Sequence, residues 1–385
     1  MPSSVTAMAV ELVTGAPVPF LDLGHVNEPV RDEFLRLVGE LVDTGSFTNG
    51  PPVRELERQF AEYCGAAHCI GVASGLDALR VALRALDIGP GDEVIVPANT
   101  FLATLEAVSQ VGARPVPIDV SPADYNIDPE AVEAAVGART RAVLPVHLYG
   151  QLADMVAIHR IAAAHGLSVV EDACQAHGAT RDLLHAGAAG DAAAFSFYPG
   201  KNLGAFGDAG ALVTGSAEID RRARSLREHG QTRKYVHGEI GYTARLDTIQ
   251  ALALLLKLPA LDAANAQRRA AAATYRSLLD GVGDVVLPPV APGSEPVWHL
   301  YELRTSHRDA LAGHLRERGI ATGLHYPQVA PLSRAYSDLG YAPGSFPVSE
   351  ALARELLSLP IFPGIAEAQL AAVADGIRSF FARGG

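Results

Sequence analysis

The stretch Ser168-Val169-Val170-Glu171-Asp172-Ala173-Cys174-Gln175-Ala176-His177-Gly178 decides how this chain folds. Residues 168–170 favour a β-strand, and two acidic residues follow them directly. Ligands collect at the carboxyl ends of the strands in a parallel sheet, so Asp172 is expected where a buried strand opens into a pocket. An aspartate that caps the following turn explains the same pattern equally well.

Helical and extended segments alternate on both sides of this strand. Apolar periodicity predicts strands at 69–72, 93–96, 115–118, 142–145, 168–170 and 211–213, and helices at 53–63, 76–86, 100–110, 129–135, 155–165 and 219–229. Short apolar strands separated by helices are typical of a mainly parallel sheet that is covered on both faces. We therefore expect an α/β fold built on one large sheet.

The last third of the chain has a different pattern. A long segment rich in Ala and Leu, 246–275, precedes a predicted strand at 297–304 and predicted helices at 308–318 and 366–381. These elements predict a smaller α+β domain. The expected division is a flexible N-terminal extension at 1–18, a large domain at 19–255 and a small C-terminal domain at 256–385.

Composition excludes several classes of protein. The 385 residues are 49% hydrophobic, which is enough for a large core. No apolar run approaches the roughly 20 residues of a membrane span, and no secretory signal is recognised, so a cytoplasmic protein is expected. Cys64, Cys69 and Cys174 give neither a disulfide framework nor a metal-ligand spacing. A net charge of −12 argues against binding to nucleic acid.

A second stretch, 194–204, contains one lysine in unusual surroundings. A strand ends near Ser196, Pro199-Gly200 turns the backbone, and Lys201 follows among small and apolar residues. Pyridoxal 5′-phosphate (PLP) needs a lysine to form an imine and an acid, here Asp172, to keep its pyridine nitrogen protonated. A solvated loop lysine is the ordinary alternative, but the chain has few lysines and this one has apolar neighbours.

Other strand ends supply further candidate contacts to such a cofactor. Gly75 and Leu76 follow a Ser-Gly turn into a helix, whose backbone N–H groups suit a phosphate, and Ser196 can offer a hydroxyl to the same anion. Gln175 is placed to bond the ring hydroxyl, and Phe101 can stack on the ring. A serine cap and core packing of phenylalanine are the ordinary explanations of the Ser-Gly turn and of Phe101.

Taken together, these stretches resemble the PLP-dependent nucleotide-sugar aminotransferases, a family with the fold type I architecture of aspartate aminotransferase. The resemblance runs from about Pro19 almost to the C-terminus. The matching stretches are SGLDAL at 74–79, GDEVIVPANTFLAT at 91–104, LPVHLYGQLADM at 144–155, VEDACQAHGA at 170–179, FSFYPGKNLGAFGDAGALVTG at 195–215, GYTARLDTIQA at 241–251 and VWHLYELRT at 297–305.

The resemblance implies a role for each matching residue. Lys201 is then the Schiff-base lysine, Asp172 the partner of the pyridine nitrogen and Gln175 the contact to the ring hydroxyl. Phe101 lies against the ring, and Gly75, Leu76 and Ser196 surround the phosphate. Family members are homodimers that share their active sites, and an Asn of one subunit reaches the partner's cofactor phosphate. This chain has Thr243 at that position, and Leu76 where many members have Thr.

His177 narrows the expected substrate. With the stretch FYPGKNLG, it resembles the branch that aminates carbon 3 of keto-deoxysugars linked to thymidine diphosphate (TDP). The resemblance places the His177 ring near the substrate in a catalytic role, although a structural histidine is an equal alternative. The expected substrate contacts are His177 and Tyr198, together with Arg233, Lys234, His325 and Tyr326 for the diphosphate. No metal is expected.

The implied reaction is a two-stage transamination in which glutamate aminates the cofactor and the cofactor aminates the sugar ketone. A 4-keto sugar is the alternative substrate. Family relatives that dehydrate sugars carry histidine in place of the lysine, so Lys201 argues against dehydration. A noncatalytic PLP-binding regulator with the same fold stays open. The absence of a G-x-G-x-x-G after the first strand argues against a nicotinamide-dependent dehydrogenase.

Overall fold

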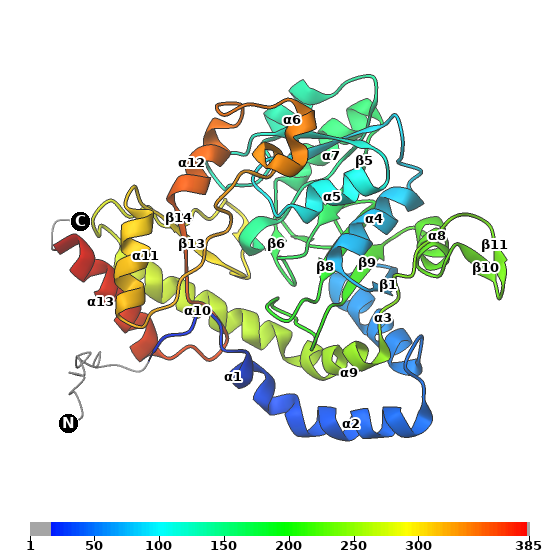
Figure 1. Cartoon of the computed structure of the whole chain (residues 1–385), viewed down its shortest axis with the longest axis horizontal. Coiled ribbons are helices and arrows are strands. Elements are labelled where there is room, and N and C mark those ends of the chain that lie inside the picture. Colours follow the sequence, from blue (N-terminus) through cyan, green and yellow to red (C-terminus); the bar gives the residue numbers. More distant parts are fainter. Residues whose placement is uncertain (1–16, 383–385) are drawn as a thin grey trace, which may run out of the picture.

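The computed structural model describes residues 17–382 and contains one large sheet of seven strands (Figure 1). The strand order is β1-β9-β8-β5-β4-β2-β3, and only β9 runs antiparallel to its neighbours. This mainly parallel sheet confirms the α/β prediction. The strands are β1 (His68–Val72), β2 (Glu93–Pro97), β3 (Arg114–Ile118), β4 (Thr140–Val143), β5 (Ser168–Asp172), β8 (Ala192–Ser196) and β9 (Gly210–Thr214).

The sheet is buried on both faces because alternate residues of its strands enter different cores. In β2, Val94 and Val96 belong to one buried cluster, whereas Ile95 belongs to another. Helix α4 packs on β8 and β9, and α7 packs near β4 and β5. The helices of this part are α3 (Pro51–Cys64), α4 (Gly75–Ala85), α5 (Ala103–Gln110), α6 (Pro129–Ala135), η2 (Leu148–Gly150), α7 (Met155–His165) and α8 (Ala217–Arg227).

A second, smaller core lies around a two-stranded sheet of β13 (Tyr301–Arg304) and β14 (Leu356–Leu359). Sequence predicted only β13, and placed its start four residues too early. The predicted boundary at 255/256 falls inside α9, and the division into domains stays a prediction. The helices here are α9 (Thr248–Lys257), η3 (Leu258–Ala260), α10 (Leu261–Leu279), α11 (Arg308–Glu317), η4 (Ala330–Leu332), η5 (Arg334–Leu339), α12 (Pro347–Glu355) and α13 (Glu367–Ala382).

The stretch Thr248–Leu279 is long and apolar enough to pass for a membrane span by length and composition. It consists of α9 and α10, joined by η3. Helix α9 contacts α2 and α3, and α10 contacts α13. Within α10 the buried Arg268 donates to the carbonyls of Trp298 and Ile361 at 3.1 and 2.9 Å. The stretch therefore has the contacts of a core helix.

The chain begins and turns in ways that the sequence did not predict. Of the expected N-terminal extension, residues 1–16 lie outside the described residues, and Val18 pairs with Ile320. Helices α1 (Leu23–Asn27), η1 (Glu28–Val30) and α2 (Arg31–Thr44) follow, and α2 lies beside α9 (Figure 1). Short strands β6 (Thr180–Arg181), β7 (Leu184–His185) and β12 (Ser294–Glu295) form a third sheet.

A hairpin projects from the large part of the molecule beyond α8 (Figure 1). Its strands are β10 (Gln231–Arg233) and β11 (Val236–His237). Tyr235 at its tip and Ile240 after it are 81% and 88% exposed, so this arm presents apolar surface that the described chain does not cover.

Candidate active site

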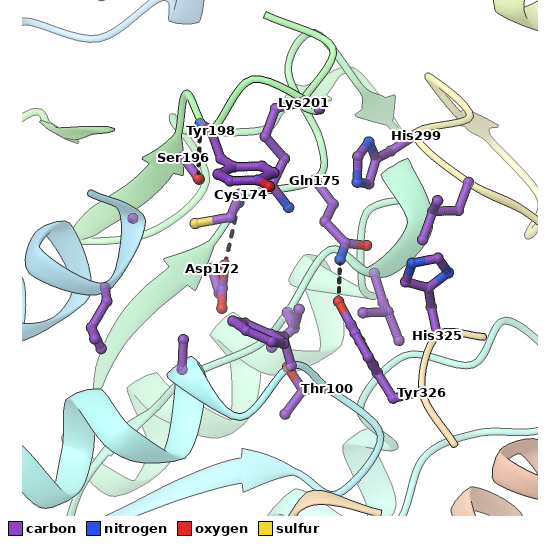
Figure 2. A pocket seen from close by; sticks show the side chains of 18 of the residues that line it. Thr100, Asp172, Cys174, Gln175, Ser196, Tyr198, Lys201, His299, His325 and Tyr326 are labelled. Carbon is purple, nitrogen blue, oxygen red and sulfur yellow. Dashed lines mark hydrogen bonds between the residues drawn. The ribbon is translucent and has the colours of Figure 1, made fainter. Parts of the chain in front are cut away.

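A cavity of about 590 Å³ lies at the carboxyl ends of β5 and β8 (Figure 2). It collects side chains from strand ends, from the start of α4 and from the segment after Gly323, as expected for a ligand site of a parallel sheet. The sequence-predicted residues that line it are Gly75, Leu76, Phe101, Asp172, Gln175, Ser196, Tyr198, Lys201, His325 and Tyr326.

Asp172 ends β5 and is held by hydrogen bonds on both carboxylate oxygens. The hydroxyl of Thr104 donates to Oδ2 at 2.8 Å, and the backbone N–H of Cys174 donates to Oδ1 at 3.2 Å. Thr100 lies 2.8 Å from Thr104 between the hydroxyl oxygens. The acid thus bonds the following turn and faces the cavity at once, so both sequence interpretations hold. A carboxylate fixed in this way suits a cationic ring nitrogen.

Lys201 brings the amine of its side chain into the same cavity (Figure 2). Burial lowers its pKa, which the nearby carboxylate of Asp172 opposes. A lowered pKa favours the neutral amine, which is the form that attacks a carbonyl or accepts a proton. The other lysines lie elsewhere, since Lys257 donates to the carbonyl of Gly204 at 2.6 Å and Lys234 is exposed on the hairpin.

The start of α4 forms a cradle for an anion. Ser74 caps the helix by accepting from the backbone N–H of Asp77 at 3.0 Å, and Gly75 and Leu76 begin the helix at the cavity wall. The first N–H groups of a helix have no partner inside it. A Cβ on Gly75 would lie 2.6 Å from Sγ of Cys174 and would also collide with Ser196. Only glycine therefore lets the start of α4 lie this close to both residues.

The amide of Gln175 has a fixed orientation. Its Oε1 accepts from the backbone N–H of Tyr149 at 2.7 Å, so its Nε2 is the donor that faces the hydroxyl of Tyr326 at 3.1 Å (Figure 2). The ring of Phe101, half exposed at 55%, lies 5.6 Å from the ring of Tyr326. A donor amide and an open aromatic face therefore both border the cavity.

His177 does not line the cavity, contrary to its expected place near the substrate. The ring is fully buried, 5.3 Å from the ring of Phe195 and 5.8 Å from that of Phe197. Neither ring nitrogen has a hydrogen-bond partner of normal geometry among the described residues. The physical reason is the turn after Gln175, which directs residue 177 into the core behind β8. This position favours the structural alternative.

His177 gives a testable pH dependence of stability. Burial lowers its pKa from 6.5 to about 3, so the folded protein keeps the ring neutral where the unfolded chain protonates it. Between these two values the free energy of unfolding falls as the pH falls, by up to about 1.4 kcal/mol per pH unit from this residue. We expect His177→Phe to flatten this dependence, as measured by chemical unfolding at several pH values. Equal slopes in both proteins would contradict the assignment.

Three other predicted site residues also lie away from this cavity. The hydroxyl of Thr243 is 3.2 Å from Nε2 of His229 and is exposed. Arg233 and Lys234 are exposed on the β10–β11 hairpin. The single chain therefore does not bring these side chains to its own cavity, which stays lined by few cations.

The structure adds residues that the sequence did not single out. Thr104 bonds Asp172, and the partly buried His299 places Nδ1 3.2 Å from Oδ1 of Asn202. Burial lowers the pKa of His299 well below its usual value, which keeps this ring neutral beside Lys201. The sequence signal for Thr104 was its four-residue spacing from Thr100, within the motif around Phe101. The remaining additions to the cavity wall include Phe20, Glu106, Cys174, Asp208 and Arg268.

The residues present fit PLP. Four features line this one cavity: the amine of Lys201, a hydrogen-bonded acid, a helix start that suits a phosphate, and a donor for a ring hydroxyl. No group of three or more His, Cys, Asp or Glu side chains in residues 17–382 is arranged to hold a metal ion.

Known proteins share this architecture. The transaminase for dTDP-3-amino-3,4,6-trideoxy-alpha-D-glucose from Streptomyces venezuelae is 48% identical over 366 residues, which cover 95% of this chain and 97% of the relative. The erythromycin biosynthesis sensory transduction protein EryC1 from Saccharopolyspora erythraea is 49% identical, over 90% of this chain and 94% of its own.

A solved structure matches equally well. The crystal structure of S. venezuelae DesV in complex with a ketimine intermediate superimposes with a TM-score of 0.93 at 48% identity, and the match covers 95% of this chain and 99% of that one. The crystal structure of ntda from Bacillus subtilis, at 31% identity and a TM-score of 0.88, has the cofactor bound as PMP, and the cofactor of this chain is PLP.

The family model described as DegT/DnrJ/EryC1/StrS aminotransferase matches residues 29–378. With the relatives above and the PLP-compatible cavity, this match makes the chain a member of the DegT/DnrJ/EryC1/StrS aminotransferase family.

Proposed function

We propose that this aminotransferase moves an amino group from glutamate to carbon 3 of a keto-deoxysugar linked to a nucleotide, most simply TDP. The observation that carries the proposal is the presence of Lys201 and Asp172 in the wall of one cavity. The S. venezuelae relative, a 3-amino-sugar transaminase, supplies the substrate class.

Residue roles in this proposal follow the contacts of each side chain. With PLP bound, the amine of Lys201 would hold the cofactor aldehyde, and Asp172, oriented by Thr104, would hold the proton on the ring nitrogen. Nε2 of Gln175 donates to the ring hydroxyl, and Phe101 covers the ring face. Gly75, Leu76 and Ser196 hold the phosphate with backbone N–H groups and one hydroxyl.

PLP supplies an electron sink that stabilises negative charge on the carbon attached to its imine. The side chains around the cavity bind the reactants and move the protons. Lys201, once displaced, accepts a proton from the donor carbon and returns it in the second half of the reaction, a role that its lowered pKa supports. The apolar walls of the cavity limit the access of water to this amine.

A homodimer with shared active sites belongs to the same proposal. The cavity of one chain has few cations for a diphosphate, whereas Arg233 and Lys234 sit on an exposed arm that ends in Tyr235. A partner's arm that carries these cations to the cavity accounts for both features. Thr243, near the base of the arm, is the candidate contact to the partner's cofactor phosphate. We place the enzyme in the cytoplasm.

A panel of substrates tests the proposal. Purified enzyme receives glutamate with 3-keto or 4-keto nucleotide sugars, and NMR locates the new amine on the sugar ring. We expect amination at carbon 3. Amination only at carbon 4 would move the assignment to the alternative substrate class.

A noncatalytic regulator is the rival that the name of the S. erythraea relative raises. Its cofactor would give the visible band of an imine, yet glutamate would not convert this band to that of the amino form. Such a result, with no sugar aminated, would contradict the proposed function.

A further inference from the structure

A buried carboxylate, a hydroxyl and an imidazole form a chain of hydrogen bonds that ends at the cavity wall. Glu302 on β13 and Ser358 on β14 are 1% and 0% exposed, and His325 lines the cavity. The hydroxyl of Ser358 donates to Oε1 of Glu302 at 2.5 Å, and Nδ1 of His325 lies 2.6 Å from the same hydroxyl oxygen. None of the residue roles proposed above uses Glu302 or Ser358.

Strand pairing fixes this order of side chains. Glu302 and Ser358 are direct partners in the antiparallel register of β13 and β14, so their side chains share one face. On the other edge of β14, Gly323 exchanges backbone hydrogen bonds with Ser358 at 3.1 and 2.9 Å, which brings His325 beside the hydroxyl. A Cβ on Gly323 would lie 2.7 Å from Cε1 of His325, so glycine permits this approach.

Further contacts hold the His325 ring and its backbone. The ring of Phe20 stacks on it with 5.8 Å between centroids and 22° between planes. The hydroxyl of Tyr149 donates to the backbone carbonyl of His325 at 2.6 Å. The imidazole therefore has one orientation in which Nδ1 faces Ser358. The Nε2 atom of His325 has no hydrogen-bond partner among residues 17–382, and it is not one of the polar atoms that the protein shields from solvent.

The hydrogen bonds of Ser358 determine which nitrogen of the His325 ring carries a proton. A serine hydroxyl has a single hydrogen, and here that hydrogen bonds Glu302, so Ser358 can only accept from His325. Nδ1 must then carry a proton. In the neutral ring this leaves the lone pair on Nε2, at the cavity face.

We propose that Glu302 and Ser358 are positioning residues that hold His325 as the Nδ1–H tautomer, so that its Nε2 accepts a hydrogen bond from a hydroxyl group of the sugar substrate. The inference rests on the proposed function and deepens it. His325 then binds the neutral sugar ring, and not the diphosphate to which the sequence assigned it. The amino donor does not need this acceptor.

The groups around the chain of hydrogen bonds agree with this assignment. Burial raises the pKa of Glu302, and hydrogen bonds with His325 and Ser358 oppose that rise. The phenols of Tyr149 and Tyr326 stay neutral, because burial raises the pKa of both. Burial also keeps His299 neutral.

The test compares Ser358→Ala and Ser358→Thr in the holoenzyme. Nitrogen-15 NMR of labelled histidines reports the tautomer, and the His325 signal is identified by its loss in His325→Gln. Stopped-flow absorbance then measures each half-reaction separately, with glutamate or with a 3-keto TDP sugar.

We expect the Nδ1–H form in the wild type and a mixture with Nε2–H in Ser358→Ala. The apparent Kd for the sugar should rise about fivefold to tenfold, the loss of one neutral hydrogen bond, while the glutamate half-reaction keeps its rate. Ser358→Thr keeps a hydroxyl and should restore both values. As a matched control, Ser306→Ala removes a hydroxyl that bonds Asp284 outside the cavity, and it should leave the tautomer and the sugar Kd unchanged.

Three results would overturn the inference: a wild-type His325 protonated on Nε2 alone, an unchanged sugar Kd in Ser358→Ala, or equal losses in both half-reactions. Failure of the proposed function has a different signature. In that case the wild type aminates no 3-keto sugar, although NMR still reports the Nδ1–H tautomer.

Discussion

Replacement of Lys201 by arginine should lower kcat by at least about a thousandfold and remove the visible absorbance of the imine. Arginine keeps the positive charge but cannot form the imine or return a proton at neutral pH, and positioned proton transfer alone contributes about 10² to 10⁴ in rate. The cavity has no second lysine that could substitute among the described residues. Steady-state turnover and an absorbance spectrum of the purified variant measure both effects.

Lys257→Arg is the matched control for this change. Lys257 is partly buried and donates to the Gly204 carbonyl next to the turn that holds Lys201, yet it does not line the cavity. We expect it to retain the imine absorbance. A Lys201→Arg enzyme that kept both absorbance and turnover would show that the imine forms elsewhere.

Asp172→Asn is the change with the second largest expected effect, a loss of about 10² to 10³ in kcat. An amide has nearly the shape of the acid but no charge to hold a proton on the ring nitrogen, so the cofactor stabilises negative charge less well. The variant should still form the imine, because Lys201 is intact. Single-turnover rates with glutamate, followed by absorbance, measure the loss.

Two further variants serve as comparisons for the loss of rate in Asp172→Asn. Thr104→Val removes the donor to Oδ2 and should cost roughly tenfold, since the charge remains but its orientation is looser. Glu171→Gln changes the neighbouring acid, which bonds His147 at 2.8 Å on the other side of β5. The cofactor spectrum should be unchanged in that variant. An Asp172→Asn enzyme with the wild-type rate would contradict the assigned contact to the ring nitrogen.

The large sheet could be predicted because its strands carry a strong local signal. Strands such as β2 and β5 are buried on both faces and read as short apolar runs between helices. The segment 356–359 gave no such signal, because it follows α12 directly and its residues, LLSL, also suit a helix. Its pairing with β13, more than fifty residues earlier, makes it a strand. Long-range pairing of this kind has no local signature.

In the candidate site, too, residues with a local sequence signal could be predicted and residues that depend on long-range packing could not. Asp172 and Lys201 could be predicted because Asp172 ends a strand and Lys201 comes shortly after the next strand of the sheet, and the ends of neighbouring parallel strands meet at one edge. Their partners depend on packing between distant segments, so Thr104, Glu302 and Ser358 were missed as functional groups, whereas His325 was predicted as a substrate contact. His177 was placed at the substrate by resemblance, but a turn of two residues after Gln175 directs it into the core.

Chemical trapping of the cofactor tests the central claim most directly. Borohydride reduction of the holoenzyme fixes the imine as a stable amine, and mass spectrometry of the peptides then locates the added group. The chain offers only Lys201, Lys234 and Lys257 as side-chain attachment points. The account predicts the modification on Lys201 alone. Its appearance on Lys234 or Lys257, or on no lysine, would contradict the account.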